Sequence, residues 1–226
     1  MASHPFRLVV FDCDGTLVDS QHAIVAAMTE ACRGFGLAEP SAAAIRRVIG
    51  PALEQAIELL FSDCDAPTLA EIAARYRRAA QAMRREETYR EPLFPGVREA
   101  LEALDAPGVS FGIATGKNRR GLLHTLETHG LQHRFTTLQT PDTCRSKPHP
   151  EMLERAMAET GALPDETVFI GDTSFDMLMA RNAGTAAVGA GWGYHAPDEL
   201  IGAGAAAIAE APEILPVLLG ALERTA

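Results

Sequence analysis

Two pairs of aspartates stand where apolar runs end, and they carry the clearest chemical signal in the sequence. Asp12 and Asp14 follow the run 8–11, and Asp172 and Asp176 follow the run 167–170. If these runs are parallel strands of one sheet, their carboxyl ends meet at the edge where such sheets bind ligands. Carboxylates gathered there repel one another unless a cation or a proton lies between them. An all-oxygen site favours Mg²⁺ over zinc. Asp176 has an alternative interpretation, since an acid in the first turn of a helix is favourable without any metal.

The two lysines of the chain are candidates for binding an anion at the same edge. Lys117 and Lys147 are the only lysines among 20 basic residues, and each stands in a predicted loop. Lys117 follows Thr115 and Gly116, whose hydroxyl and backbone N–H could donate to the same oxyanion. A general bias toward arginine would also leave two lysines, and for Lys117 this interpretation and a role at the site are both open. For Lys147 we favour a compact positive charge for a phosphate or for the nucleophile.

Apolar runs alternate with amphipathic stretches over most of the chain, and this order predicts how the candidate residues are positioned. Runs that are apolar on successive residues are typical of buried parallel strands. We expect strands at 8–11, 109–114, 167–170 and 186–188, and weaker ones near 135–138 and 206–208. Helices are expected at 97–104, 122–129 and 150–160, with Asn118 as the cap of the second and Ser174 as the cap of a further helix. The alternation predicts a parallel α/β sheet with helices on both faces.

One long stretch interrupts the alternation. Between about residues 20 and 90 every periodic segment is helical, at 24–33, 41–49, 52–61 and 68–85. A single β–α step takes about 30 residues, whereas about 100 separate the first strand from the next clear one. The surplus is enough for a small helical bundle, with the proline-rich stretch 89–96 as its return linker. We therefore expect a core domain formed by residues 1–18 and 91–226, and a helical insertion at residues 19–90.

Composition limits the classes of protein to which the chain could belong. The chain has 226 residues, 47% of them apolar and 22% charged, which is ordinary globular composition and argues against a disordered chain or a coiled coil. Its net charge of −10 argues against nucleic acid or an anionic membrane as a partner. The four cysteines form no C-x-x-C pair, and no secretory signal or run of about 20 apolar residues is found. These features predict a cytoplasmic protein, and a monomer or a homodimer would both suit the composition.

The chemical motifs together resemble the haloacid dehalogenase superfamily. Asp12-x-Asp14-Gly-Thr, Thr115, Lys147 and Gly171-Asp172-x-x-x-Asp176 match its four motifs in order. The helical insertion after the first strand is similar to that of its subfamily I, and the stretches 11–20 and 49–53 resemble phosphoglycolate-phosphatase-like members. The resemblance covers essentially the whole chain. It implies an α/β fold with a Rossmann-like parallel-sheet core and an inserted α-helical cap domain.

The resemblance also implies catalytic roles for the acidic residues. Asp12 would be the nucleophile that attacks phosphorus and forms an aspartyl-phosphate. Asp14 would protonate the departing alkoxide and then deprotonate the water that hydrolyses the intermediate. The Asp12 carboxylate, the Asp14 backbone carbonyl and Asp172 would hold Mg²⁺. Asp176 would orient a metal-bound water or Lys147 from outside the metal's direct contacts.

The remaining matched residues would bind the substrate. Thr115, Gly116 and Lys147 would contact the phosphoryl group during its transfer, and Lys147 would thereby also be catalytic. The expected activity is Mg²⁺-dependent hydrolysis of a small-molecule phosphate monoester, of the phosphoglycolate-phosphatase-like kind. The acid at Asp14 favours ester chemistry over the dehalogenases and phosphonatases, which lack an acid there.

Two alternatives stay open at this point. A phosphosugar mutase similar to β-phosphoglucomutase uses the same four motifs and differs in how its cap retains a bisphosphate intermediate. A non-catalytic module that binds a phosphorylated ligand is the alternative from a different class of protein. A helical cap would be superfluous in a bare phosphoacceptor domain, and the added lysine and acids suit turnover.

Overall fold

The computed structural model describes residues 5–33, 35, 37–86 and 89–222, and its centre is a six-stranded parallel sheet. The strand order is β3-β2-β1-β4-β5-β6, and neighbouring strands pair in parallel throughout. The strands are β1 (Leu8–Phe11), β2 (Ser110–Ala114), β3 (Thr137–Gln139), β4 (Thr167–Gly171), β5 (Ala186–Ala190) and β6 (Ala207–Ala209). All six predicted strands are present, including the two weaker ones. Phe11 is in register with Ile113 and Ile170, so β1, β2 and β4 end at the same edge.

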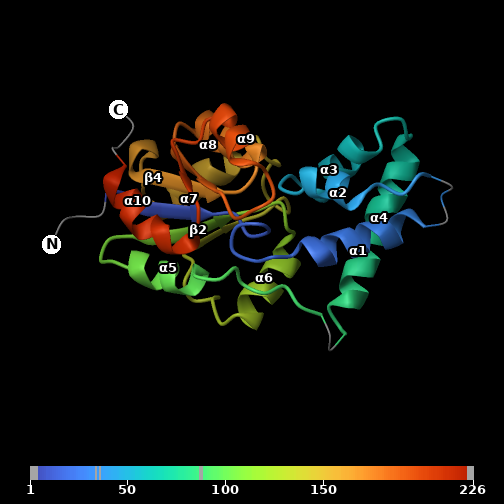
Figure 1. The fold of residues 1–226 in the computed structure, drawn as a ribbon, viewed down its shortest axis with the longest axis horizontal. Coiled ribbons are helices and arrows are strands. Elements are labelled where there is room, and N and C mark those ends of the chain that lie inside the picture. The colour runs from blue at the N-terminus through green and yellow to red at the C-terminus, as the bar shows by residue number, and fades with distance from the viewer. Residues whose placement is uncertain (1–4, 34, 36, 87–88, 223–226) are drawn as a thin grey trace.

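Helices cover both faces of the sheet, as the sequence predicts (Figure 1). On one face Val9 and Phe11 pack with α5 (Val97–Leu104), α6 (Arg119–Thr128) and α10 (Leu215–Ala221). On the other face Leu8 and Val10 pack with α7 (Glu151–Thr160), α8 (Ser174–Ala183) and α9 (Pro197–Ala203). Two short 3₁₀ turns, η1 (Pro164–Glu166) and η2 (Pro212–Ile214), precede β4 and α10. Because β1 is apolar on both faces, its side chains anchor both helical layers, and the strand is fixed directly below Asp12.

Four of the five helices described between β1 and β2 gather at one end of the molecule (Figure 1). They are α1 (Gln21–Cys32), α2 (Ala42–Arg47), α3 (Leu53–Leu60) and α4 (Ala66–Met83). Their apolar side chains form a cluster of their own around Met28, Ile45, Ile57 and Ile72, which agrees with the predicted helical insertion. No strand occurs among the described residues of this stretch. Asp65 accepts a hydrogen bond from the backbone N–H of Thr68 and so fixes where α4 begins.

The two connections between these helices and the sheet run side by side. Val18 forms an antiparallel bridge with Leu93, and the backbone N–H of Asp19 donates to the Pro92 carbonyl at 2.8 Å. The first connection turns at Gly15, whose φ of +87° and close approach to Asp172 leave no room for a side chain. The turn directly after Asp12 is therefore fixed by backbone geometry.

The predicted cap of α8 is wrong by one residue. Ser174 is the first residue of the helix, and Thr173 has the extended conformation of an N-cap. Asp176 accepts hydrogen bonds from both the backbone N–H and the hydroxyl of Thr173. These bonds make Thr173, one residue earlier than predicted, the N-cap of the helix. The Asn118 cap is confirmed, since its side chain accepts from the N–H of Gly121 at 2.8 Å. Within the described ranges no helix has the length and apolar character needed to cross a membrane.

Candidate active site

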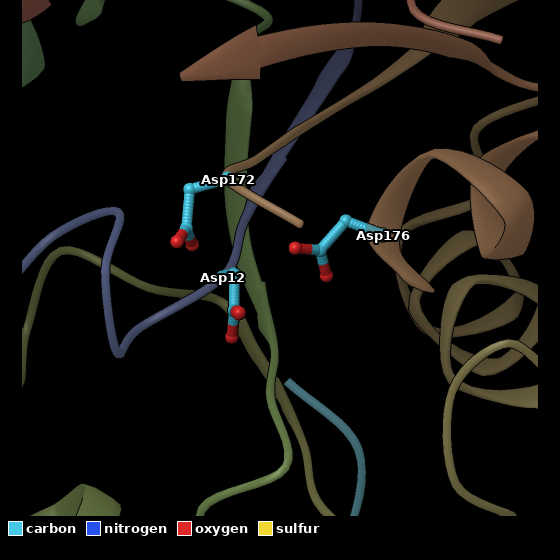
Figure 2. Close-up of side chains that lie close together, drawn as sticks. All are labelled: Asp12, Asp172 and Asp176. Atoms are coloured by element: carbon cyan, nitrogen blue, oxygen red, sulfur yellow. The ribbon is translucent and has the colours of Figure 1, made fainter. Parts of the chain in front are cut away.

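Three of the four predicted acids meet at the carboxyl ends of β1 and β4. Asp12 follows β1, Asp172 follows β4 and Asp176 lies in the first turn of α8, and the three side chains lie close together (Figure 2). One oxygen from each lies within 4.8 Å of the others, and all three side chains are buried. The parallel strands thus bring acids that are distant in the sequence together in one cluster.

Lys147 lies within this acidic cluster. Its Nζ is 2.9 Å from Oδ2 of Asp12 and 2.6 Å from Oδ1 of Asp176, and the lysine has no exposed surface. The ammonium and these two carboxylate oxygens form ion pairs, but their geometry is not that of well-aligned hydrogen bonds. Burial by itself lowers the pKa of Lys147, but the carboxylates of Asp12 and Asp176 outweigh it and raise the pKa above its ordinary value. The side chain is a fixed positive charge beside the proposed nucleophile.

Without a metal, burial and mutual repulsion make the charged forms of the acids in the cluster unfavourable. Burial raises the pKa of Asp12 to about 7, with Lys147 opposing the shift and Asp176 adding to it. Burial, followed by the charges of Asp176 and Asp12, also raises the pKa of Asp172. Asp172 is held in place nonetheless, because Thr16 donates to its Oδ1 at 2.9 Å and the N–H of Tyr194 donates to its Oδ2 at 3.0 Å. Three close oxygens, one lysine and an uncompensated negative charge fit a hard divalent cation.

Asp14, the fourth predicted acid, is not part of this cluster and pairs with the second lysine. Lys117 Nζ is 2.9 Å from Oδ1 of Asp14, and it also donates to both carboxylate oxygens of Glu91 at 3.2 Å. Lys117 therefore lies beside Asp14 at the lining of the cavity, which favours a role at the site over a residue left by arginine bias. Glu91 was missed because it is a single acid in the proline-rich linker 89–96, and no local pattern marks its contact with a lysine 26 residues away.

Thr115 and Gly116 lie at the end of β2, directly under the inserted helices. Thr115 is buried, and its hydroxyl accepts a hydrogen bond from the backbone N–H of Lys117 at 3.2 Å. A Cβ on Gly116 would overlap the carbonyl oxygens of Gly50 and Pro51, so only glycine allows the loop before α3 to lie this close. The predicted phosphate-binding pair is therefore covered by the loop that joins α2 to α3.

A cavity of about 360 Å³ opens between the sheet edge and the inserted helices. Asp12, Asp14 and Thr115 line its floor, and Tyr76 from the middle of α4 and Arg84 at the C-cap of that helix are among the residues that line its other side. Burial, then the charge of Asp14, raises the pKa of Tyr76 to about 12, so its hydroxyl stays protonated. The cavity offers a neutral donor and a guanidinium opposite the acids, which suits an anionic ester.

Residues after β5 support the cluster from behind. Nε1 of Trp192 donates to the Thr16 carbonyl at 3.0 Å, and the backbone N–H of Tyr194 donates to Oδ2 of Asp172 at 3.0 Å. His195 was missed. Its Nδ1 accepts from the N–H of Ser174 at 3.2 Å, and its Nε2 lies 3.3 Å from the Arg47 carbonyl in the inserted helices. A single histidine in a loop carries no sequence signal for such a bridge.

Comparisons with known proteins agree with this geometry. Residues 9–190 match the family model described as haloacid dehalogenase-like hydrolase. The "Probable phosphatase IndB" of Dickeya dadantii is 38% identical over 197 residues, which cover 85% of this chain and 84% of that protein. The phosphoglycolate phosphatase of Xanthomonas campestris pv. campestris is 32% identical over 197 residues, covering 85% and 86%. The crystal structure of a hydrolase from Pseudomonas syringae has a TM-score of 0.83 and 28% identity, and covers 95% of this chain and 98% of its own. With its motifs assembled at one sheet edge and most of its length matched, the chain belongs to the haloacid dehalogenase-like hydrolase family.

Proposed function

We propose that this hydrolase is a Mg²⁺-dependent phosphatase that cleaves a small-molecule phosphate monoester through an aspartyl-phosphate on Asp12. The observation that carries the proposal is the buried group of Asp12, Asp172, Asp176 and Lys147, which borders the cavity floor. Relatives named as phosphatases support the same reaction class.

The Asp12 carboxylate, the proposed nucleophile, is held by a contact to each of its oxygens. Its Oδ1 accepts a hydrogen bond from the N–H of Cys13 at 2.6 Å, and its Oδ2 is paired with Lys147. In the proposed first step an Asp12 oxygen bonds to phosphorus while the bond from phosphorus to the alcohol oxygen breaks. Asp14 gives its proton to the departing alkoxide. In the second step Asp14 takes a proton from water, whose oxygen displaces Asp12 and releases inorganic phosphate.

The metal would be held by the Asp12 carboxylate, the Asp14 backbone carbonyl and Asp172. When bound, Mg²⁺ supplies positive charge that offsets the phosphoryl oxygens and keeps Asp12 ionised. Asp176 already has two roles among the described residues, the ion pair with Lys147 and the hydrogen bonds from Thr173, so we propose that it orients Lys147 without contacting the ion.

We propose that Lys147, Thr115 and Gly116 bind the phosphoryl group. Lys147 supplies the charge, and the Thr115 hydroxyl and the Gly116 N–H supply neutral donors on the side of β2. All three lie within or beside the shared edge of the sheet, so a phosphoryl group on Asp12 would be surrounded by donors.

We propose that residues 19–90 act as a cap domain on a core of residues 1–18 and 91–226. The N–H of Ala52 donates to the Ser146 hydroxyl at 2.7 Å, beside Lys147, and Arg47 pairs with Glu199 at 2.8 Å. These contacts support a closed arrangement in which the inserted helices exclude water from the reaction. The cytoplasmic location and the monomeric or homodimeric state stay predictions from the sequence.

The test is phosphate release from a panel of phosphomonoesters, with Mg²⁺ and with a chelator, for the wild type and Asp12→Asn. We expect Mg²⁺-dependent turnover that the variant loses. Phosphoglycolate and pyrophosphate belong in the panel because relatives are named phosphoglycolate phosphatase and pyrophosphatase PpaX. Full activity of Asp12→Asn would refute the mechanism. Isomerised product from a sugar phosphate given a bisphosphate would favour a mutase, and tight binding without turnover would favour a binding module.

A further inference from the structure

Lys117 occupies a closed position between two carboxylates that belong to different segments. Its ammonium pairs with Asp14, which stands in the connection from β1 to α1, and with Glu91, which stands in the connection from α4 to α5. The lysine side chain is only 7% exposed. Its backbone is also fixed, because its N–H donates to Thr115 and the next residue, Asn118, caps α6.

Glu91 is anchored independently of Lys117. The hydroxyls of Tyr89 and Thr125 both donate to its carboxylate, and Nε2 of His129 lies 2.8 Å from its backbone carbonyl. Burial alone raises the pKa of Glu91, but the Lys117 ammonium and these hydrogen bonds bring it below the ordinary value. Glu91 is therefore a fixed negative charge, and it sets where the Lys117 ammonium lies.

Asp14, by contrast, has no such anchor of its own. Its side chain is mostly buried, and its Oδ1 has no aligned hydrogen-bond donor among the described residues. The ion pair with Lys117 at 2.9 Å compensates this oxygen. A buried carboxylate without a partner would rotate toward solvent or recruit another cation, and the proton-transfer geometry would be lost.

We infer that Lys117, held by Glu91, is a positioning residue that keeps the Asp14 carboxyl group facing the cavity where the leaving oxygen and the attacking water must lie. The inference rests on the proposed function, because it requires Asp14 to carry the proton in both steps. The proton moves only between Asp14 and the alkoxide or water, and Lys117 keeps its own protons throughout. Lys117 thereby ties the proton-transfer residue to both segments that join the inserted helices to the sheet.

A double-mutant cycle separates this role from direct substrate binding and from a purely structural role. We would measure kcat and KM of the wild type, Lys117→Met, Asp14→Asn and the double variant, with Mg²⁺ and 4-nitrophenyl phosphate, whose good leaving group preserves residual turnover without Asp14. General acid–base catalysis contributes about 10²–10⁴-fold. We expect Lys117→Met to lower kcat about 10- to 100-fold with KM nearly unchanged, and to cause no further loss in the Asp14→Asn background. Lys117→Arg should restore part of the loss.

Controls keep the two proposals separately falsifiable. Arg78→Met removes a cation paired with Glu71 on an exposed helix face and should leave kcat unchanged. Glu91→Gln, expected to give a smaller loss with the same dependence on Asp14, replaces Lys117→Met if the latter does not fold by circular dichroism. Wild-type kcat in Asp14→Asn would overturn the proposed function. An equal loss from Lys117→Met in both backgrounds, or a loss confined to KM, would overturn the role of Lys117 alone.

Discussion

The acidic cluster predicts an unusual dependence of stability on pH in the metal-free protein. Burial raises the pKa of Asp12 from 3.8 in the unfolded chain to about 7 in the folded one. Between these values the folded state binds more protons than the unfolded state, so the stability from this group is present at low pH and is lost as pH rises through 7. Linkage with these two pKa values gives a loss of about 3 kcal/mol between pH 5 and pH 8. For a chain of this length that corresponds to a fall of about 6–12 °C in Tm.

The assay is thermal unfolding at pH 5, 6, 7 and 8 with a chelator, and again with saturating Mg²⁺. Asp12→Asn is the matched control, because it removes the titrating carboxyl group. Other groups whose pKa values are shifted, such as His195, are present in both proteins and contribute to both pH profiles. In the chelator, the wild type should lose more stability between pH 5 and pH 8 than the variant does. Saturating Mg²⁺ should remove most of this extra loss, because a cation compensates the ionised acids. Identical pH profiles for the two proteins in the chelator, or Mg²⁺ stabilisation that is as large at pH 5 as at pH 8, would refute the reasoning.

Three further substitutions test other parts of the site. Lys147→Met leaves buried carboxylates without their ammonium and should destabilise the protein by about 3–5 kcal/mol in urea unfolding; unchanged stability would contradict the ion pairs. Gly116→Ala should lower kcat/KM strongly, because the loop before α3 could no longer lie against β2, whereas Gly202→Ala, whose Cβ meets nothing, should leave kcat/KM unchanged. Thr16→Val removes the hydroxyl that donates to Asp172 and should weaken Mg²⁺ binding about 10-fold in calorimetry, and an unaltered affinity would argue against Asp172 as a ligand.

The parts of the site that could be predicted from the sequence are those set by local structure. Asp12 and Asp172 each stand directly after an apolar run, and parallel strands bring their carboxyl ends to one edge whatever the rest of the fold does. The helical insertion was visible because about 70 residues without strand character exceed what one β–α step needs. The short strands β3 and β6 gave only weak patterns because runs of three residues are too short to distinguish a buried strand from a loop.

The contacts that escaped prediction depend on how distant segments pack. Glu91 meets Lys117, and His195 meets Arg47, across 26 and 148 residues of chain, and neither pair is marked by spacing or composition. The cap of α8 was misplaced because Thr173 and Ser174 are both good N-cap residues, and the acceptor Asp176 decides between them. Side-chain networks of this kind follow from the tertiary fold, and only their members' chemical types can be read beforehand.

The negative net charge of the chain conflicts with an anionic substrate only when the charges of the whole molecule are summed. The chain carries −10, yet its site is proposed to take an anionic ester. Within the cluster, three carboxylates against the Lys147 ammonium leave a formal charge of −2, which one divalent cation cancels. Surface acids beyond about 8 Å are largely screened at physiological salt. A phosphate group would therefore meet a neutral cluster with Lys147 and backbone donors facing it. If the proposed function holds, the same count predicts that the metal is needed for binding as well as for chemistry. We therefore expect orthovanadate to bind tightly with Mg²⁺ and weakly in a chelator.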